Sequence, residues 1–337
     1  MNRIYFILFG LLVLSSCKNE PKQEETINWK RTTNEVILRL DENPDCLNPV
    51  LATTTYATEV QQQIFSYLLT LNPVTLEFIP QLAKGWPEEK EVTQGPFAGG
   101  MAYTFEILDE AVWDDGSPVT GEDFIFTVKT IYVPQLSTQR IRPYLALIKD
   151  IEVDEGNPKR FTVYTEKTDN AVEYLTNTMF VLPAHIYDAA GTLKDIPLVD
   201  FLDEQKIEDL SASNEKIGEF AKEFSSPKFS HDITAISGSG PYKIESWETG
   251  NDVVLVKKEN WWGASLAGQY KSLSAKPERL IYKPIIDNVT ALAALKSEEL
   301  DAMSNIDPAD FTTLRQDSLL TSIYNFETPA FLGYYML

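Results

Sequence analysis

The sequence predicts a mixed α/β protein, and three observations support this class. Short segments rich in Val, Ile, Leu and aromatic residues alternate in polarity, as half-buried strands do. Longer segments, such as residues 120–131, instead carry apolar residues at helical spacing. The two kinds of segment follow one another along 337 residues that are 43% hydrophobic, which is enough apolar sequence for a substantial core.

Residues 1–16 have the organisation of a signal peptide. Arg3 precedes an apolar run, residues 4–14, that is shorter than a transmembrane helix normally requires. The run ends in Leu-Ser-Ser followed by Cys17, and polar residues follow at once, an order that resembles the lipobox of bacterial lipoproteins. We therefore expect lipid on Cys17 and a flexible tether over residues 17–34. An ordinary signal peptide with a chance cysteine is the alternative.

A strand and a helix come next. Residues 35–40 (EVILRL) alternate in polarity and predict a strand, which the turn formers of DENPDCLNP end. Residues 54–71 predict a helix, because apolar side chains recur at helical spacing until Asn72-Pro73 stops it. Residues 102–108 (AYTFEIL) alternate again and predict a second strand.

An acidic stretch, VWDDGSPVTGED, follows that strand and could be either a site or a corner in the chain. Asp114 and Asp115 lie among turn-forming residues, and we expect them to shape a turn. Residues 120–123 have the form of a capping box, in which Glu122 and Asp123 lie at the positive end of a helix. The segment lacks the alternating ligand positions, and the bidentate acid further along the chain, that a calcium-binding loop requires. The sequence therefore favours a structural corner over a calcium site.

The second half of the chain adds several strands. Residues 160–166 (RFTVYTE) predict one strand, and residues 279–286 (RLIYKPII) predict another. Residues 242–247 and 253–258 flank the turn formers ETGND and predict a β-hairpin.

Helical segments separate these strands. Pro183 lies near the start of a short helix predicted over residues 181–190, and the polar, weakly patterned residues 191–235 predict a helical surface excursion. Residues 287–303 predict a helix capped by Asp287 or Asn288. The apolar face expected for this helix carries Val289, Leu292 and Leu295.

Composition excludes several classes of function. The formal charge of −21 opposes binding to nucleic acid. If Cys17 carries lipid, no disulfide forms within the chain, and we expect Cys46 to be a buried thiol. His185 and His231 lie far apart without metal-ligand spacing, and no nucleotide-binding glycine loop occurs in the sequence. We therefore expect neither a metal nor a cofactor.

Seven segments follow one another between residue 35 and the end of the chain: LNPVLATTTYATEVQQQIFSYLLTLNP, IPQLAKGWPE, YTFEILDEAVWDDGSPVTGEDFIFTV, LPAHIYD, GSGPYKIESWETGNDVVLVKKENWWG, ALAALKSEELDAM and FLGYYML. In this order they resemble family 5 of the extracytoplasmic solute-binding proteins, which serve ABC importers of oligopeptides, dipeptides and nickel complexes. One such motif is weakly specific. Seven in order are specific for the family, although not for its ligand.

The departures from the family pattern fall mostly at turns. Leu108 and Glu110 stand where the family favours Arg and Gly, and Lys258-Glu259 replace an Asn-Pro. Glu298 replaces a helix-ending Gly, so we expect a strained or altered helix end. Family members continue into a second lobe after the strand that matches FLGYYML, and the resemblance therefore implies a chain that stops at this crossing.

The resemblance implies an α/β clamshell of the type II periplasmic-binding-protein kind. Lobe I would comprise residues 35–58 and 185–332, and residues 59–184 would form a subdomain inserted into it. Residues 333–337 would be the crossing strand toward a second lobe that is largely missing.

The function implied is capture of a peptide between two lobes and its delivery to ABC permease subunits of the inner membrane. Backbone pairing would bind peptides of many sequences without catalysis, and the negative charge favours neutral or cationic ones. The residues expected to contact ligand are Asp45, Cys46, Leu47, Asn48, Thr53, Thr54, Tyr56, Gly333, Tyr334 and Tyr335. For each, a purely structural role is the alternative. The protein would be a monomer, lipid-anchored to a bacterial membrane and facing the periplasm or the cell exterior.

Other interpretations stay open. A surface lipoprotein could bind a glycan or a protein partner without transport, and a metal complex could replace the peptide. A hydrolase could use paired carboxylates such as Asp114 and Glu122, although capping already explains those acids. Trp113, Trp261 and Trp262 could line a cleft, but their turn and hairpin positions favour the core.

Overall fold

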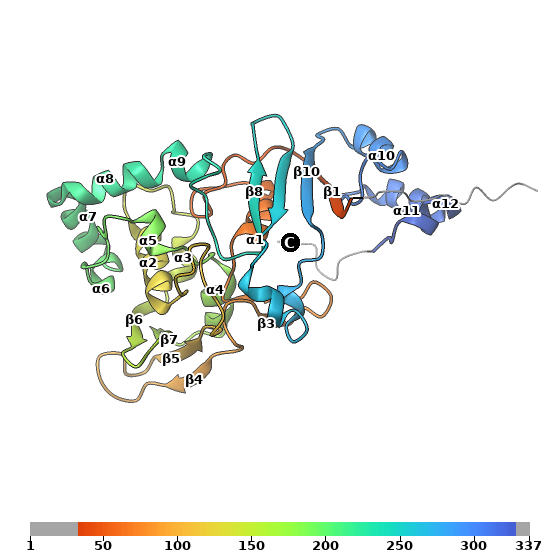
Figure 1. Ribbon diagram of the computed structural model, residues 1–337. Helices are drawn as coiled ribbons and strands as arrows, with labels where there is room; N and C mark the ends of the chain where they lie inside the picture. The colour runs from red at the N-terminus through yellow and green to blue at the C-terminus, as the bar shows by residue number, and fades with distance from the viewer. Residues whose placement is uncertain (1–32, 328–337) are drawn as a thin grey trace, which may run out of the picture. The chain divides into compact units, whose positions relative to one another are not determined.

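The computed structural model describes residues 33–327, which form two four-stranded sheets, one two-stranded sheet and the helices around them (Figure 1). The apolar core is continuous from one four-stranded sheet to the other. Within the described residues no helix combines the length and the apolar composition needed to cross a bilayer. Cys17 and the crossing segment 333–337 lie outside the described residues, and the division of residues 35–332 into a lobe and an inserted subdomain stays a prediction.

The first sheet has the strand order β1 (Glu35–Leu40), β10 (Arg279–Pro284), β9 (Val253–Lys257) and β8 (Tyr242–Ser246). The first pair is parallel and the other two are antiparallel, so the predicted strands and hairpin are confirmed. On the free side of β1, the Arg39 backbone N–H donates to the Ala302 carbonyl at 3.0 Å. The segment before the last helices therefore covers this sheet edge, which removes an exposed row of backbone groups.

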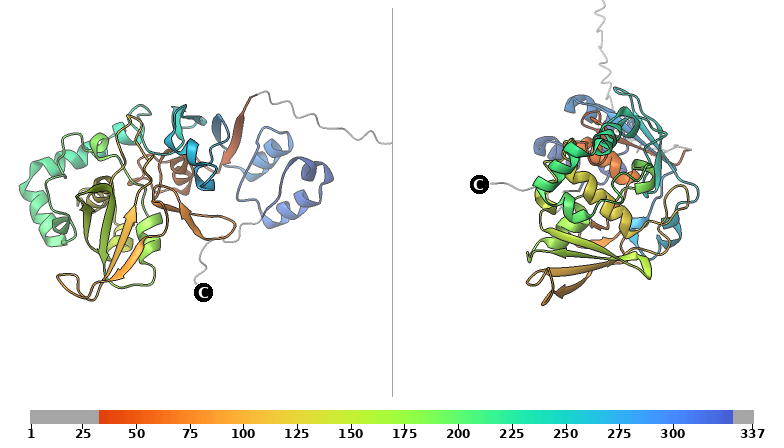
Figure 2. Two further views of the ribbon diagram at one scale, coloured as in Figure 1. Left: turned by 60° about the horizontal axis from the view of Figure 1, so that its bottom comes forward. Right: turned by 90° about the vertical axis from the view of Figure 1, so that its left-hand side faces the viewer.

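The second sheet is antiparallel, with the order β4 (Glu88–Glu91), β5 (Met101–Glu106), β7 (Asn157–Thr165) and β6 (Ile148–Asp154). Helix α2 (Gly121–Tyr132) packs against this sheet (Figure 2). Gly121 allows the close approach, because a Cβ there would come within 2.8 Å of the Val153 side chain and 2.9 Å of Phe161. The predicted strands at 102–108 and 160–166 are confirmed, whereas β4 and β6 carry no prediction from the sequence.

The helix predicted over residues 54–71 is wrong in its second half. Helix α1 (Thr55–Ile64) ends early, and β2 (Leu69–Leu71) pairs instead with β3 (Phe78–Pro80). Groups from distant parts of the chain form hydrogen bonds with the backbone after α1 ends. The Gly240 N–H donates to the Ile64 carbonyl at 2.8 Å, and the Tyr67 N–H donates to Gln81 Oε1 at 2.8 Å. Tertiary hydrogen bonds thus replace those that would have continued the helix.

Residues 171–230 supply the helical end of the molecule, in which the order is α4 (Ala171–Asn177), α5 (Ala184–Tyr187), α6 (Leu198–Phe201), α7 (Glu204–Ser213), α8 (Glu215–Phe224) and α9 (Pro227–Ser230). The surface excursion predicted for residues 191–235 is wrong in one respect. Phe201, Phe224 and Phe229 from this segment are almost fully buried in the core. The aromatic spacing of α8 gives it a buried face that the polar composition conceals.

The last described helices are α10 (Asn288–Lys296), α11 (Pro308–Gln316) and α12 (Ser318–Ile323). Asp287 caps α10 through its side chain, as predicted. The predicted apolar face is wrong at Val289, which is 75% exposed, because the buried side of α10 consists of Ala291, Ala294 and Leu295. Ala294 and Leu295 form a small apolar cluster with Leu300. Glu298, just after α10, has φ 61°. A non-glycine residue therefore adopts the left-handed backbone conformation that commonly follows a helix, as expected from the sequence.

Candidate ligand-binding loop and acidic corner

The loop that follows β1 carries most of the residues predicted to contact ligand, and we call residues 45–56 the ligand loop. Its inner side is held by Asn48, which is fully buried. The Asn48 amide donates from Nδ2 to the Phe224 carbonyl at 3.1 Å, and Oδ1 accepts from the Val50 N–H at 3.0 Å. Leu47 is also fully buried. The structure therefore turns Leu47 and Asn48 inward, where they hold the loop.

The outer side of the ligand loop is organised by Asp45. Its Oδ2 accepts from the backbone N–H and the hydroxyl of Thr53, each at 2.8 Å, and its Oδ1 accepts from the Thr54 hydroxyl at 2.9 Å. Burial acts to raise the pKa of Asp45, but these bonds and one from the Cys46 backbone outweigh it, so the pKa lies below its usual value. An ionised and exposed carboxylate is thus fixed beside the two threonines.

The remaining predicted residues in this loop have mixed roles. Thr54 also caps α1 by accepting from the Ala57 N–H at 3.2 Å, and Tyr56 is half-buried against the core. Cys46 is half-buried rather than fully buried, and burial raises the pKa of its thiol to about 11. The structure thus leaves Asp45 and Thr53 exposed. Gly333, Tyr334 and Tyr335 lie outside the described residues.

The second acidic segment, residues 112–123, is a corner of the chain that we call the acidic corner. Asp115 shapes its turn, as predicted, by accepting from the Ser117 N–H at 2.9 Å and the Ser117 hydroxyl at 2.6 Å. These bonds, first of all, hold the pKa of Asp115 below its usual value, and His185 contributes to the same effect. The other oxygen of Asp115 lies 2.8 Å from His185 Nε2.

The contacts of His185 do not match the geometry of a catalytic triad. The Ser117 hydroxyl lies 3.4 Å from Nε2 of His185, the same ring nitrogen that meets Asp115. A nucleophilic serine activated by histidine needs the carboxylate on one ring nitrogen and the hydroxyl on the other. This arrangement therefore stabilises the corner and does not activate Ser117.

Asp114 has a role that the sequence does not reveal. Instead of shaping its own turn, it pairs with Lys258 Nζ at 2.6 Å and accepts from the Ser237 hydroxyl at 2.9 Å. Lys258 also donates to the Gly238 carbonyl at 2.7 Å, and burial lowers the pKa of Lys258. Because Lys258 directly follows β9, this pair ties the acidic corner to the first sheet.

The helix that leaves the corner is capped as predicted. Asp123 accepts at Oδ2 from the Thr120 N–H at 2.9 Å and at Oδ1 from the Ala184 N–H at 3.0 Å. Burial raises the pKa of Asp123, and these bonds oppose that effect. Glu122 is exposed in the first turn of α2. The two acids considered for a hydrolase are thus an ion-pair partner, Asp114, and a helix N-terminal residue, Glu122.

The three tryptophans lie in the core, as their positions predict. Trp113, Trp261 and Trp262 are 2%, 8% and 9% exposed. The indole N–H groups of Trp261 and Trp262 both donate to the Ser239 carbonyl, at 2.9 and 3.0 Å. Their hydrogen bonding partly explains why two adjacent indoles can be buried here.

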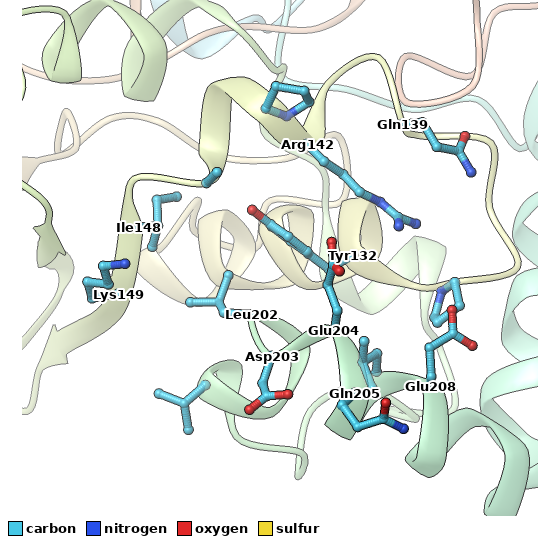
Figure 3. A pocket seen from close by; sticks show the side chains of 15 residues that line it. Tyr132, Gln139, Arg142, Ile148, Lys149, Leu202, Asp203, Glu204, Gln205 and Glu208 are labelled. Atoms are coloured by element: carbon cyan, nitrogen blue, oxygen red, sulfur yellow. The ribbon is translucent and has the colours of Figure 1, made fainter.

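A cavity of about 1110 Å³ lies at the C-terminal end of α2, between α3 (Arg142–Leu145) and α7 (Figure 3). Arg142 closes the end of α2 by donating to the Ile131 carbonyl at 3.0 Å and the Val133 carbonyl at 3.0 Å. Acidic side chains such as Glu204 come from the opposite wall. This cavity shares no residue with the ligand loop, and the sequence interpretation does not single it out.

Comparison with known families agrees with this architecture. The family model described as "Bacterial extracellular solute-binding proteins, family 5 Middle" matches residues 77–337. The chain therefore belongs to family 5 of the bacterial extracellular solute-binding proteins. Its fold is the mixed α/β fold of the type II periplasmic binding proteins.

Individual relatives are distant and longer. The chain is 25% identical over 191 residues to the probable peptide-binding protein YejA of Agrobacterium fabrum, which covers 54% of this chain and 25% of the relative. It is 22% identical to the oligopeptide-binding protein OppA of Bacillus subtilis, over 94% of this chain and 52% of the relative. The structure resembles the oligopeptide-binding protein AppA of Bacillus subtilis in complex with a nonapeptide, with a TM-score of 0.58, 19% identity, and coverage of 84% of this chain and 46% of that chain. The chain thus spans about half or less of the length of these proteins.

Proposed function

We propose that this chain is part of a peptide-binding component of an ABC importer. In this proposal a peptide is captured in a cleft between two lobes and handed to permease subunits of the inner membrane. The observation that carries the proposal is the family match over residues 77–337. The relatives named above as peptide-binding proteins support the ligand class.

Within this proposal the ligand loop contributes contacts from the first lobe. The exposed Asp45 carboxylate is held in place by Thr53 and Thr54 and is suited to a peptide ammonium group. The formal charge of −21 favours the same cationic or neutral ligands. Gly333, Tyr334 and Tyr335 would add contacts from the crossing segment. Binding by backbone pairing then requires no catalytic group, and we propose that the chain is not an enzyme.

We also propose that the protein is a monomeric lipoprotein. Cys17 would carry the lipid after removal of residues 1–16, and residues 17–34 would separate the membrane from the binding fold. The protein would face the periplasm or the cell exterior, where a peptide ligand is met before it reaches the permease.

Native mass spectrometry tests this function directly. The protein would be purified gently from its own cells, with the lipid removed, and activated in the gas phase. The proposal predicts release of a spread of small peptides. A preparation that never releases peptide, but retains a glycan or a protein partner, would contradict transport and favour the surface-lipoprotein alternative.

A further inference from the structure

A second cavity, of about 510 Å³, lies beside α2, from its first turn to Lys129 in its last turn. Residues 117–120, the inner side of α2, and residues 184–194 after the start of α5 form its walls. Its floor is apolar, with Ile125, Phe126 and Leu193 all buried. The volume lies within the usual range for small-molecule sites, about 300–1,000 Å³. The cavity shares no residue with the ligand loop, so an inference about it stands apart from the proposed peptide site.

The wall of this cavity contains a buried cation, Lys129, which is 6% exposed. Its Nζ donates to the Leu193 carbonyl at 3.0 Å and to the Lys194 carbonyl at 3.3 Å. An ammonium group has three N–H donors. Within residues 33–327, the third N–H has no oxygen or nitrogen acceptor, and no carboxylate lies within ion-pair distance of Nζ. The same Nζ lies over the Phe201 ring, 5.9 Å from its centroid, which is a weak cation–π contact and supplies no negative charge.

The nearby acids are engaged elsewhere. Asp188 accepts from the backbone N–H groups of Thr192 and Leu193, each at 2.8 Å, and Asp123 caps α2. Burial lowers the pKa of Lys129, and the more distant charges of Glu122, Asp195 and Asp188 only partly oppose this. A buried charge normally has a charged partner, and here the chain does not supply one at contact distance.

We propose that this cavity binds a small aliphatic carboxylate, with its carboxylate on Lys129 and its hydrocarbon chain against Ile125, Phe126 and Leu193. The single buried ammonium and the apolar floor match a monoanion with an apolar stem. A phosphate dianion fits less well, because it needs several donors and would meet the negative charge of Glu122. The other titratable groups that line the cavity are Asp123, His185, Asp188 and Lys194.

Isothermal titration of the purified protein with sodium hexanoate tests the site. We expect saturable binding of one hexanoate per chain. The affinity for 1-hexanol, which lacks the charge, should be at least about tenfold lower. The Lys129→Met variant should lose at least about tenfold in hexanoate affinity, as expected for loss of a charge-assisted hydrogen bond.

Two further variants make the test specific. Lys222→Met removes an exposed lysine that does not line the cavity and should leave hexanoate affinity unchanged, whereas Glu122→Gln removes a competing negative charge from the cavity and should strengthen it. Absence of saturable binding, equal binding of hexanol, or equal loss in the two lysine variants would overturn the proposal. If Lys129→Met fails to fold, the hexanol comparison and the gain in Glu122→Gln decide the question.

Discussion

The ligand loop and the acidic corner use the same local chemistry for different ends. In both, an aspartate accepts a hydrogen bond from the threonine that precedes a helix: Asp45 from Thr54 before α1, and Asp123 from Thr120 before α2. In the corner, the acids reach across the fold to Lys258, His185 and the Ala184 N–H. In the ligand loop, Asp45 stays exposed, and its bonded partners are residues of its own loop.

This difference separates a segment that connects distant parts of the fold from a loop whose polar side chains stay exposed. The acidic corner connects the first sheet, through Lys258, to helix α2 on the second sheet. The carboxylates of Asp114, Asp115 and Asp123 already have partners within the fold. The buried Asn48 side chain anchors the ligand loop to the core, and Asp45 lies on the exposed side of the same loop. Acidic residues alone therefore do not mark a site, because their partners decide whether they remain available.

The largest expected effect comes from Asn48→Ala, on the inner side of the ligand loop. The substitution leaves the Phe224 carbonyl and the Val50 N–H without their buried partner. We expect the free energy of unfolding, measured by urea titration, to fall by about 3 kcal/mol. Asn251→Ala, at an exposed turn, is the control and should change it by less than about 0.5 kcal/mol. A small effect at Asn48 would mean that the loop is not anchored there.

Asp114→Asn tests the ion pair by which the acidic corner contacts the first sheet. It removes the ionic partner of Lys258, whose side chain is 11% exposed. We expect a loss of about 2 kcal/mol in the free energy of unfolding, less than for a fully buried pair because the Asp114 side chain is 40% exposed. Peptide binding should be unchanged. Loss of binding with full stability would instead make the acidic corner a site, and Glu110→Gln is the exposed control.

Asp45→Asn should affect binding more than stability. The variant keeps some hydrogen bonding to Thr53 and Thr54 but loses the negative charge, so stability at pH 7 should fall by about 1 kcal/mol. Affinity for peptides with a free amino terminus should fall several-fold, while affinity for their acetylated forms should change little. Equal losses for both peptide forms would argue against contact between Asp45 and the ammonium group. Isothermal titration with matched peptides measures the difference.

The pH dependence of stability gives an independent check on Asp45. Its pKa is lowered in the folded state, so its stabilising contribution is present above the unfolded value, about 3.9, and is lost as pH falls through the folded value. The stability difference between the wild type and Asp45→Asn should therefore shrink in acid. A difference that grows in acid would contradict the observed bonding.

The last prediction concerns the reactivity of Cys46 and involves neither folding stability nor peptide affinity. Burial raises the pKa of its thiol to about 11, so little thiolate is present at pH 8. In a Cys17→Ser variant, alkylation of Cys46 by iodoacetamide at this pH should be at least roughly tenfold slower than in urea. A rate equal to that of the unfolded chain would show that the ligand loop opens freely.

Local patterns predict the elements whose partners are nearby in sequence. The strand at residues 35–40, the hairpin after Pro241, and the cap of α2 follow from alternation and capping chemistry. The helix predicted through Leu71 fails because its apolar spacing also suits β2, and pairing with β3 decides between the two. Strand β4 is an exposed edge of charged residues and carries no apolar signal.

The candidate site shows the same limit. Turn chemistry predicts that Asp115 bonds locally, but nothing near Asp114 points to Lys258, because long-range pairs depend on the whole fold. Likewise the segment "LNP" predicts a turn, yet only the structure shows that Asn48 reaches Phe224. Residues that look alike in sequence therefore divide into anchors and exposed groups only after folding.

Hydrogen exchange with and without the peptides released from the native protein tests the central claim most directly. If the ligand loop contacts peptide and the acidic corner only connects parts of the fold, residues 45–56 gain protection on binding and residues 112–123 do not change. Protection of the acidic corner alone, with the ligand loop unchanged, would contradict the account.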